Sequence, residues 1–458
     1  MSSSVVPSGW HITTLEACVD ILDSQRVPVN NIERQTRIQS KSPDQLYPYF
    51  GATGEVGKID NYLFDEELVA LGEDGVPFLD PRKPKAYKLS GKTWVNNHAH
   101  VLRAVGGATT NQFLLHYLNQ FDYQGYVNGG TRLKLTQANM RRMPFPIPPL
   151  AEQKVIADKL DTLLAQVENT KARLERIPQI LKRFRQSVLA AAVSGRLTED
   201  GEIKGESYPP TKLASLCTTA FDGPFGSKLK SSDYTAGGVG VVRLENIRHL
   251  RFDESKETFI SEDKYLTLIK NTLKKRDILF SSFVDEEVRA CLFPFETLRF
   301  INKADCFCLR IDQEKALPEF ILYLLTSQYS YTQIKEHVQG VTRPRVNLKI
   351  LKSLEFPVPS LQVQAEVVHQ VNQLFAHADR IEQQVNNALA RVNNFTQSIL
   401  AKAFRGELTE QWRKDNPELT SGENSAEALL KRIKTEREIS DKQPRKRKVG
   451  KKRDRKNP

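Results

Sequence analysis

Apolar residues recur in two stretches of the chain at a spacing that alternates between four and three. In the first stretch only Thr170 interrupts the apolar series, and in the second Ala378 and Ala388 complete it. The other positions of this predicted seam are Ile156, Leu160, Leu163, Val167, Leu174, Ile177, Leu181 and Phe184, and then Val367, Val371, Leu374, Ile381, Val385, Val392 and Phe395. Such spacing is typical of coiled-coil helices. Each stretch is predicted to form a helix of roughly 50 Å, at about 1.5 Å per residue.

The two stretches are copies of each other. Residues 145–200 align without a gap on residues 356–411, and Gly129, Thr131 and Arg132 match Gly340, Thr342 and Arg343 just upstream. Two long apolar seams in one chain most economically pack on each other, so the sequence predicts an antiparallel pair of helices. Docking of each helix onto its own globular domain is the alternative. Pro178 lies inside the first seam and is predicted to kink the helix or to mark a step in it.

The segments before each helix, residues 1–144 and 201–355, are predicted to be globular. Each mixes short β-like runs (99–104, 239–244 and 306–311) with one apolar helix, near 113–118 and 320–325. They share little sequence with each other. The expected fold class is α+β: two mixed α/β domains separated by two long helices, 145–200 and 356–411, that form an antiparallel coiled coil with pseudo-two-fold symmetry. A short helical extension over 412–441 and a basic tail over 442–458 follow.

The tail carries most of the net charge. It holds ten Lys or Arg residues and one acid, so it supplies nine of the twelve net positive charges. A segment of this composition is expected to be disordered and to bind phosphates without reading sequence, although a merely solubilising terminus is the alternative. The start of the chain lacks a secretory signal, which predicts a cytoplasmic protein. The five scattered Cys residues predict reduced, mostly buried thiols.

Motifs of common catalytic sites are absent from the sequence. It contains no Gly-x-x-x-x-Gly-Lys-Ser/Thr phosphate loop and no Asp/Asn-Pro-Pro-aromatic segment of the adenine methyltransferase kind. His98 and His100 have the spacing of metal ligands, but no further ligand cluster accompanies them, so a strand with alternating histidines is the favoured interpretation. The sequence therefore predicts neither a catalytic nor a metal site.

Several segments carry a resemblance to a known family. They are FPIPPLAEQ, the helix LDTLLAQVENTKARLERIPQILKRFRQSVLAAAVSGRLTE, its second copy ending VNNALARVNNFTQSILAKAFRGELTEQWR, and ENSAEALLKRIK. Over its whole length the chain resembles the DNA-specificity (S) subunit of type I restriction-modification systems, the IA-like branch in particular. The resemblance implies two target-recognition domains, each reading one half of a bipartite, asymmetric DNA site, with the helices setting the spacer between the halves.

The resemblance also implies partners and cofactors. Two methyltransferase (M) subunits would dock on the helices and methylate adenine with S-adenosylmethionine. Restriction (R) subunits would add cleavage that depends on ATP and magnesium. The S subunit itself would be non-catalytic and would bind no cofactor, while its choice of site would dictate both methylation and restriction.

Polar and basic residues of the glycine-rich loops are the predicted DNA contacts, because backbone can approach DNA closely there. They are Thr53, Lys58, Asn96, Asn97, His98 and Arg132 in the first head, and Ser227, Lys228, Lys230, Ser231, Arg243, Asn246, Arg343 and Arg345 in the second.

Two functions from other classes stay open on the sequence alone. A coiled-coil protein-interaction scaffold with two unlike heads would expose apolar patches and show no salt-sensitive affinity for DNA. A self-sufficient DNA-modifying enzyme would act as a purified chain with cofactor alone.

Overall fold

The computed structural model describes residues 6–197, 210–337 and 344–442. The chain divides into two compact units, Met1–Leu174 with Asn387–Pro458, and Glu175–Asn386. Each unit contains one head together with parts of both long helices.

The two long helices are α5, Leu150–Val193, and α10, Leu361–Phe404, with 44 residues each. Both lie inside the stretches for which the apolar spacing predicts helix. Pro178 is accommodated within α5, which continues through it. The predicted kink or step at this proline therefore does not end the helix.

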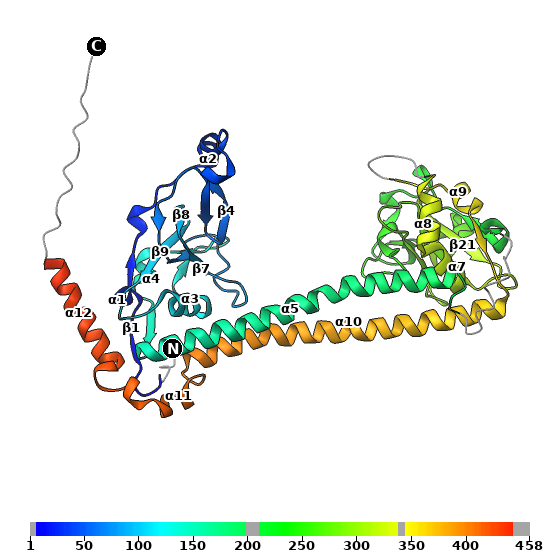
Figure 1. Ribbon diagram of the computed structural model, residues 1–458. Coiled ribbons are helices and arrows are strands. Elements are labelled where there is room, and N and C mark those ends of the chain that lie inside the picture. The colour runs from blue at the N-terminus through cyan, green and yellow to red at the C-terminus, as the bar shows by residue number, and fades with distance from the viewer. Residues whose placement is uncertain (1–5, 198–209, 338–343, 443–458) are drawn as a thin grey trace, which may run out of the picture. The chain divides into compact units, whose positions relative to one another are not determined.

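The helices run antiparallel within each unit (Figure 1). In the first unit, Leu160 near the start of α5 shares a buried core with Phe404 at the end of α10. In the second unit, Leu189 near the end of α5 shares a core with Val371 near the start of α10. The predicted antiparallel coiled coil is confirmed.

The seam follows the predicted residues with one correction. Every predicted seam position is buried or half-buried except Phe395, which is 59% exposed, and Thr170, the polar member, is also exposed. A helix turns once per 3.6 residues, so a strict seven-residue pattern drifts by about 20° per heptad. The buried side of α10 therefore passes to the half-buried Thr396 and the buried Leu400.

The first head contains two four-stranded sheets and two two-stranded pairs. Strand β1 (His11–Thr14) pairs with β12 (Pro144–Ile147), so the two ends of the head are joined to each other. One sheet has the order β2-β9-β6-β7 and the other β4-β3-β8-β5. The strands are β2 Val19–Ile21, β3 Tyr47–Gly51, β4 Gly54–Ile59, β5 Phe64–Asp65, β6 Leu68–Gly72, β7 Ala86–Leu89, β8 Lys92–Val95 and β9 Ala99–Ala104, with the hairpin β10 Val127–Asn128 and β11 Lys134–Leu135; the helices are α1 Leu15–Cys18, α2 Asn31–Ile38, α3 Asn111–Gln120 and α4 Gln137–Arg141.

The second head is built in the same way. Strands β13 (Pro210–Lys212) and β22 (Glu355–Pro357) join its ends, and its sheets have the orders β14-β21-β18-β19 and β15-β17-β16-β20. The strands are β14 Cys217–Phe221, β15 Tyr234–Thr235, β16 Val239–Val242, β17 Phe259–Ile260, β18 Ile278–Ser281, β19 Ala290–Leu292, β20 Phe300–Asn302 and β21 Cys306–Ile311; the helices are α6 Glu262–Thr267, α7 Pro318–Thr326, α8 Gln328–Lys335 and α9 Leu348–Ser353.

The heads share the topology of their antiparallel sheet although their sequences differ, whereas the strand orders of their mixed sheets are different. In each, the four-stranded antiparallel sheet is assembled in the same chain order, and the other sheet contains one parallel pair, β3 with β8 or β16 with β20. Strands β9 and β21 occupy the predicted runs 99–104 and 306–311. Strand β16 ends at Val242, earlier than predicted, because a 3-10 turn follows over Leu244–Asn246.

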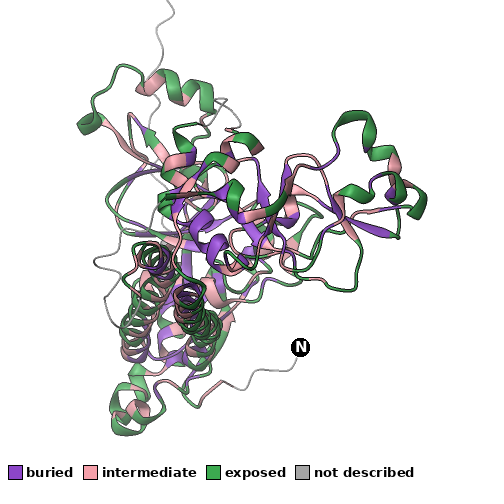
Figure 2. Cartoon of the chain, turned by 90° about the vertical axis from the view of Figure 1, so that its right-hand side faces the viewer, coloured by how far each residue is buried: buried purple, intermediate pink, exposed green. Residues whose placement is uncertain are grey.

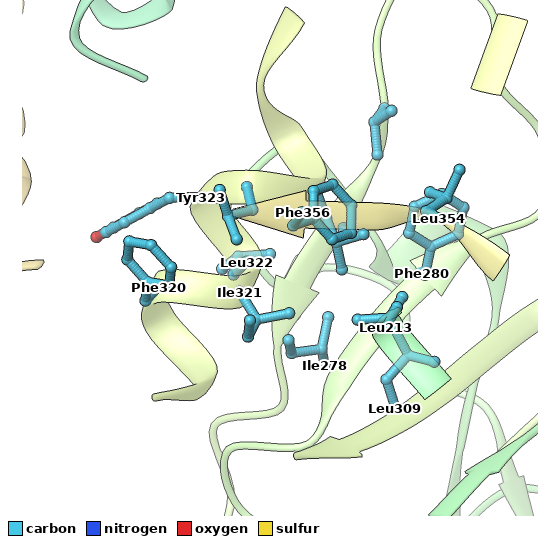
Figure 3. Close-up of a cluster of buried hydrophobic side chains, with 14 of the residues drawn as sticks. Leu213, Ile278, Phe280, Leu309, Phe320, Ile321, Leu322, Tyr323, Leu354 and Phe356 are labelled. Atoms are coloured by element: carbon cyan, nitrogen blue, oxygen red, sulfur yellow. The ribbon is translucent and has the colours of Figure 1, made fainter. Parts of the chain in front are cut away.

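Helix α7 forms the core of the second head. Pro318 at its start suits a first helical turn, and every residue of the helix except Glu319 is buried. Ile321 lies beside Ile278 of β18 (Figure 3), and Phe320 and Phe280 belong to the same buried core. A helix that is apolar all round is expected where it is covered on all sides, here by the sheet and by the long helices.

Side chains of α3 and α7 also tie each head to a long helix. The Tyr323 hydroxyl of α7 donates to Asn372 Oδ1 on α10 at 2.6 Å. At the corresponding place in the first head, His116 Nε2 of α3 lies 2.7 Å from Asp161 Oδ1 on α5. Buried residues gather in the sheets and on the helix sides that face them, whereas the outer faces of the long helices are exposed (Figure 2).

A glutamine repeated in both helices explains part of the internal repeat. Gln153 donates from Nε2 to Pro148 O at 3.0 Å and also to the loop ahead of α3. Gln364 does the same with Pro359 O at 2.8 Å and the loop ahead of α7. Both glutamines are buried, so each fixes its head on the start of its helix.

The C-terminal extension packs on the first unit. It contains α11, Glu410–Asp415, and α12, Ala426–Lys442. The fully buried carboxylate of Glu152 accepts hydrogen bonds from Trp10 Nε1 at 2.9 Å, from Thr409 Oγ1 at 2.6 Å and from Arg413. Because a buried carboxylate must be paired, this cluster holds the extension to the start of α5.

The cysteines match the expectation of reduced thiols. All five are free, and only Cys217 is not fully buried. Burial raises the pKa of Cys291 to about 12, so this thiol stays protonated at neutral pH. In the described part of the chain, none of the helices combines the length and apolar character that a membrane crossing requires.

Candidate nucleic-acid interface

Three segments of the first head meet at one edge of its antiparallel sheet. They are residues 73–75 after β6, residues 96–98 between β8 and β9, and residues 132–135 just before α4. Backbone hydrogen bonds join them: Glu73 N to His98 O at 2.8 Å, Gly75 N to Leu133 O at 3.1 Å, and Leu135 N to Glu73 O at 2.7 Å. We call these three segments the edge junction of the first head.

The second head has the same junction, bond for bond. Its segments are residues 282–284, 303–305 and 344–346. Ser282 N donates to Asp305 O at 2.9 Å, Val284 N to Pro344 O at 3.1 Å, and Val346 N to Ser282 O at 2.9 Å. The two heads therefore present different side chains from the same backbone arrangement.

An aspartate organises the first edge junction. Asp74 Oδ1 lies 2.9 Å from His98 Nδ1 and accepts a hydrogen bond of 2.9 Å from Arg132 Nη2. Partial burial raises the pKa of Asp74, but the Arg132 hydrogen bond and the neighbouring His98 outweigh it, so the pKa lies below its usual range. The carboxylate is therefore ionised at neutral pH and holds the arginine in place.

The second edge junction has its aspartate on another segment. Asp305 Oδ1 accepts a hydrogen bond of 2.9 Å from Ser282 Oγ and lies 3.8 Å from Arg345 Nη1. The Arg345 guanidinium lies 4.3 Å from the centre of the Phe283 ring. Cation–π contact and ion pairing together restrict this arginine.

A second aspartate in each head forms hydrogen bonds to residues in or next to the edge junction. In the first head, Asp23 Oδ1 accepts from Val101 N at 2.9 Å, and Asp23 Oδ2 lies 2.6 Å from His100 Nδ1. In the second head, Asp222 Oδ1 accepts from Asp305 N at 3.0 Å. Burial raises the pKa of Asp222 to about 6, although the backbone hydrogen bonds act in the opposite direction.

The structure brings together some of the DNA contacts predicted in the first head. His98 and Arg132 meet at the edge junction, and Asn96 Oδ1 accepts from His98 N at 2.8 Å, which shapes the turn. Asn97 is exposed in the same turn and Thr53 in the turn between β3 and β4.

Lys58 lies outside the edge junction of the first head. It is exposed on β4, where its ammonium group pairs with Glu55 at 2.8 Å.

In the second head, Arg345 lies in the edge junction, and Arg343 is outside the described residues. The loop that carries Ser227, Lys228, Lys230 and Ser231 is a separate surface segment on which these four side chains are exposed.

Arg243 belongs to a small basic cluster that reaches the second junction. Its guanidinium lies 5.9 Å from the centre of the Tyr234 ring, whose hydroxyl accepts from Lys303 Nζ at 2.6 Å. Lys303 is part of the junction turn, so the cluster extends the positive charge beside it. Sequence reasoning missed Lys303 because no local motif marks it.

Asn246 requires a correction. It is only 4% exposed, its Oδ1 accepts from Arg243 N, and its Nδ2 donates to Asp253 O and Lys256 O. Both amide hydrogens are used inside the loop, so Asn246 holds the loop together and does not present a group to DNA.

The structure places each of the two closely spaced histidines of the first head beside an aspartate. Among the described residues no group of three or more His, Cys, Asp or Glu side chains is placed to hold a metal ion. His98 and His100 are paired instead with Asp74 and Asp23, and His100 lies in strand β9 as the alternating pattern predicts.

Comparison with known proteins agrees with this architecture. The model of the type I restriction modification DNA specificity domain matches residues 9–179 and 227–391. The chain belongs to this family. The EcoBI specificity subunit of Escherichia coli is 43% identical over 67% of each chain. The EcoDI specificity subunit of Escherichia coli is 34% identical over 96% of this chain and 98% of the relative.

Solved structures of the family share the fold. A chain of a type I R-M system, described for its complex assembly and conformational transition, has a TM-score of 0.63 at 16% identity, over 88% of this chain and 99% of that one. The HsdS subunit from Thermoanaerobacter tengcongensis has a TM-score of 0.52 at 16% identity, over 88% and 98%. The chain is thus a DNA-sequence-specificity subunit, and the protein-interaction scaffold is not favoured.

Proposed function

We propose that each head of this specificity subunit reads one half of a bipartite, asymmetric DNA site. The observation that carries this proposal is the edge junction, because the same backbone frame displays Asp74, His98 and Arg132 in one head and Phe283, Asp305 and Arg345 in the other. Two heads that share a backbone arrangement but present different side chains suit two half-sites of different base sequence.

The long helices set the spacer between the half-sites and dock the partner subunits. Two methyltransferase subunits supply adenine methylation with S-adenosylmethionine, and restriction subunits supply the steps that need ATP and magnesium. Membership of the family supports this division of labour. The specificity subunit itself contributes recognition and no catalytic group.

Methylation mapping tests the proposal. The full chain is expressed with the methyltransferase subunit of its own system in a host without adenine methyltransferases, and methylated adenines are located across the genome. We expect one motif with two unlike halves separated by a spacer of fixed length. A continuous motif, or methylation without sequence preference, would contradict the reading of two half-sites.

Two control cultures separate the rival functions. The methyltransferase subunit expressed without this chain should leave the motif unmodified. The chain expressed without the methyltransferase subunit should also leave DNA unmodified, and modification by the chain alone would identify a self-sufficient enzyme instead.

A further inference from the structure

Each edge junction places one arginine beside one aspartate. Arg132 donates to Asp74 at 2.9 Å, and Arg345 lies 3.8 Å from Asp305. Both arginine side chains remain well exposed, at 66% and 51%, whereas the two aspartates are only 20% and 25% exposed. The Arg132 guanidinium is therefore held on one side by a hydrogen bond, and the Arg345 guanidinium by the longer ion pair together with the Phe283 ring. Both are open to solvent on the other side.

An arginine fixed in this way is poorly suited to general phosphate binding. The neighbouring carboxylate cancels much of the positive charge that attracts phosphates, and it is itself repelled by them. The same carboxylate uses only part of the five N–H donors of the guanidinium. The donors that remain free are held in a defined direction, which favours recognition of a particular base edge.

Guanine is the base that such a group matches. Its O6 and N7 atoms form two adjacent acceptors in the major groove, and bidentate contact from arginine is the commonest specific contact to them. We propose that the edge junction of each head reads a guanine, through Arg132 held by Asp74 in the first head and through Arg345 held by Asp305 in the second. This inference rests on the proposed reading of half-sites by the heads.

The aspartates approach their arginines from different segments. Asp74 belongs to the segment after β6, whereas Asp305 belongs to the turn between β20 and β21. At the position equivalent to Asp305, the first head has His98. The arginines also differ in position, because Arg345 corresponds to Lys134 of the first head, which pairs with Glu73 at 3.1 Å. The frame therefore carries its arginine at two different places, which gives two half-sites in which the guanine stands at different places.

Single substitutions with matched controls test the inference. Arg132→Ala and Arg345→Ala are compared with Arg82→Ala and Arg248→Ala. The control arginines are also exposed and paired with aspartates of the same heads, Asp80 at 3.2 Å and Asp253 at 3.1 Å, but lie outside the junctions. Each full-length variant is expressed with the methyltransferase subunit, and methylation rates are measured on a library in which every motif position is varied.

We expect Arg132→Ala to lose discrimination of one G·C pair in the first half-site, by roughly 5- to 150-fold, and to keep the second half-site intact. Arg345→Ala should do the reverse. The controls should leave both halves unchanged. A uniform loss across all sequences, with a weaker salt dependence, would identify a phosphate contact and overturn the inference, as would an unchanged motif. In either case the wild-type motif still reports on the proposed function.

The role of Asp74 as a positioning residue is tested separately. Asp74→Asn removes the negative charge, so it should raise affinity for random DNA while relaxing the same G·C position as Arg132→Ala. Asp74→Glu should restore part of the discrimination. A variant that loses affinity for all DNA alike would show that Asp74 only supports the fold and would contradict its role in positioning.

Discussion

Asp222 makes the stability of the second head depend on pH. Its carboxylate holds the Asp305 turn through a backbone hydrogen bond, yet burial raises its pKa from 3.8 to about 6. The folded chain therefore binds this proton more tightly than the unfolded chain does. Between these two pKa values stability falls as pH rises, and above about 6 the full cost of ionisation is present.

Asp222→Asn is therefore expected to stabilise the second head at pH 8, because the amide oxygen can still accept the two backbone hydrogen bonds and carries no charge. At pH 3.5 the variant and the wild type should unfold at nearly the same temperature. Thermal unfolding at both pH values measures the difference, and an equal effect at both would contradict the assignment.

Asp23 provides the opposite case in the first head. Burial acts to raise its pKa, but the hydrogen bond and charge of His100 lower it below 3.8, so its ionised form favours folding. This contribution is present above the ordinary pKa and is lost as pH falls through the lowered value. Asp23→Asn should accordingly lower the unfolding temperature of the first head at pH 7. It serves as the control for Asp222→Asn, which is expected to stabilise the second head.

Among the elements, the long helices were the most predictable from sequence. Their apolar spacing is a local pattern, and a helix of this length needs a continuous apolar face wherever it lies. The pattern failed at Phe395 because spacing alone cannot show where a straight helix drifts out of register with its partner. Strands β9 and β21 were also found from local apolar runs.

The edge junction could not have been found in this way. Asp74, His98 and Arg132 come from three separate parts of the chain, and hydrogen bonds between backbones bring them together. The sequence pattern marks polar and basic residues of glycine-rich loops, and nothing local in it marks the aspartates that orient the arginines. Asn246 has the right chemistry for a base contact, but its groups are used inside its own loop.

The seam offers a test of packing at the scale of the element. Leu160 and Phe395 were both predicted seam positions, but Leu160 is fully buried and Phe395 is 59% exposed. Leu160→Asp would bury an unpaired charge at a cost of several kcal/mol, which should lower the unfolding temperature of the first unit by roughly 5–10 °C. Phe395→Asp should change it little. Equal effects of the two substitutions would contradict the observed face of the helix pair.

At the scale of the whole molecule, each head has its two ends joined by a strand pair and is followed by one copy of the repeated helix. The pairs β1 with β12 and β13 with β22 join the ends of each head, and the buried Gln153 and Gln364 fix the heads at equivalent helix positions. A head should therefore be transferable from one helix to the other. The internal repeat further predicts that the two positions are related by a two-fold axis.

The most direct test of two separate readers is a chain that carries the same head twice. Residues 12–147 are replaced by a second copy of the equivalent residues 210–358. The reciprocal chain carries the first head twice, and adenine methylation is mapped with the methyltransferase subunit present. Because two-fold symmetry in a protein is mirrored in palindromic DNA, each chain should methylate an inverted repeat of its own half-site, with the original spacer. An asymmetric motif from either chain would contradict the account.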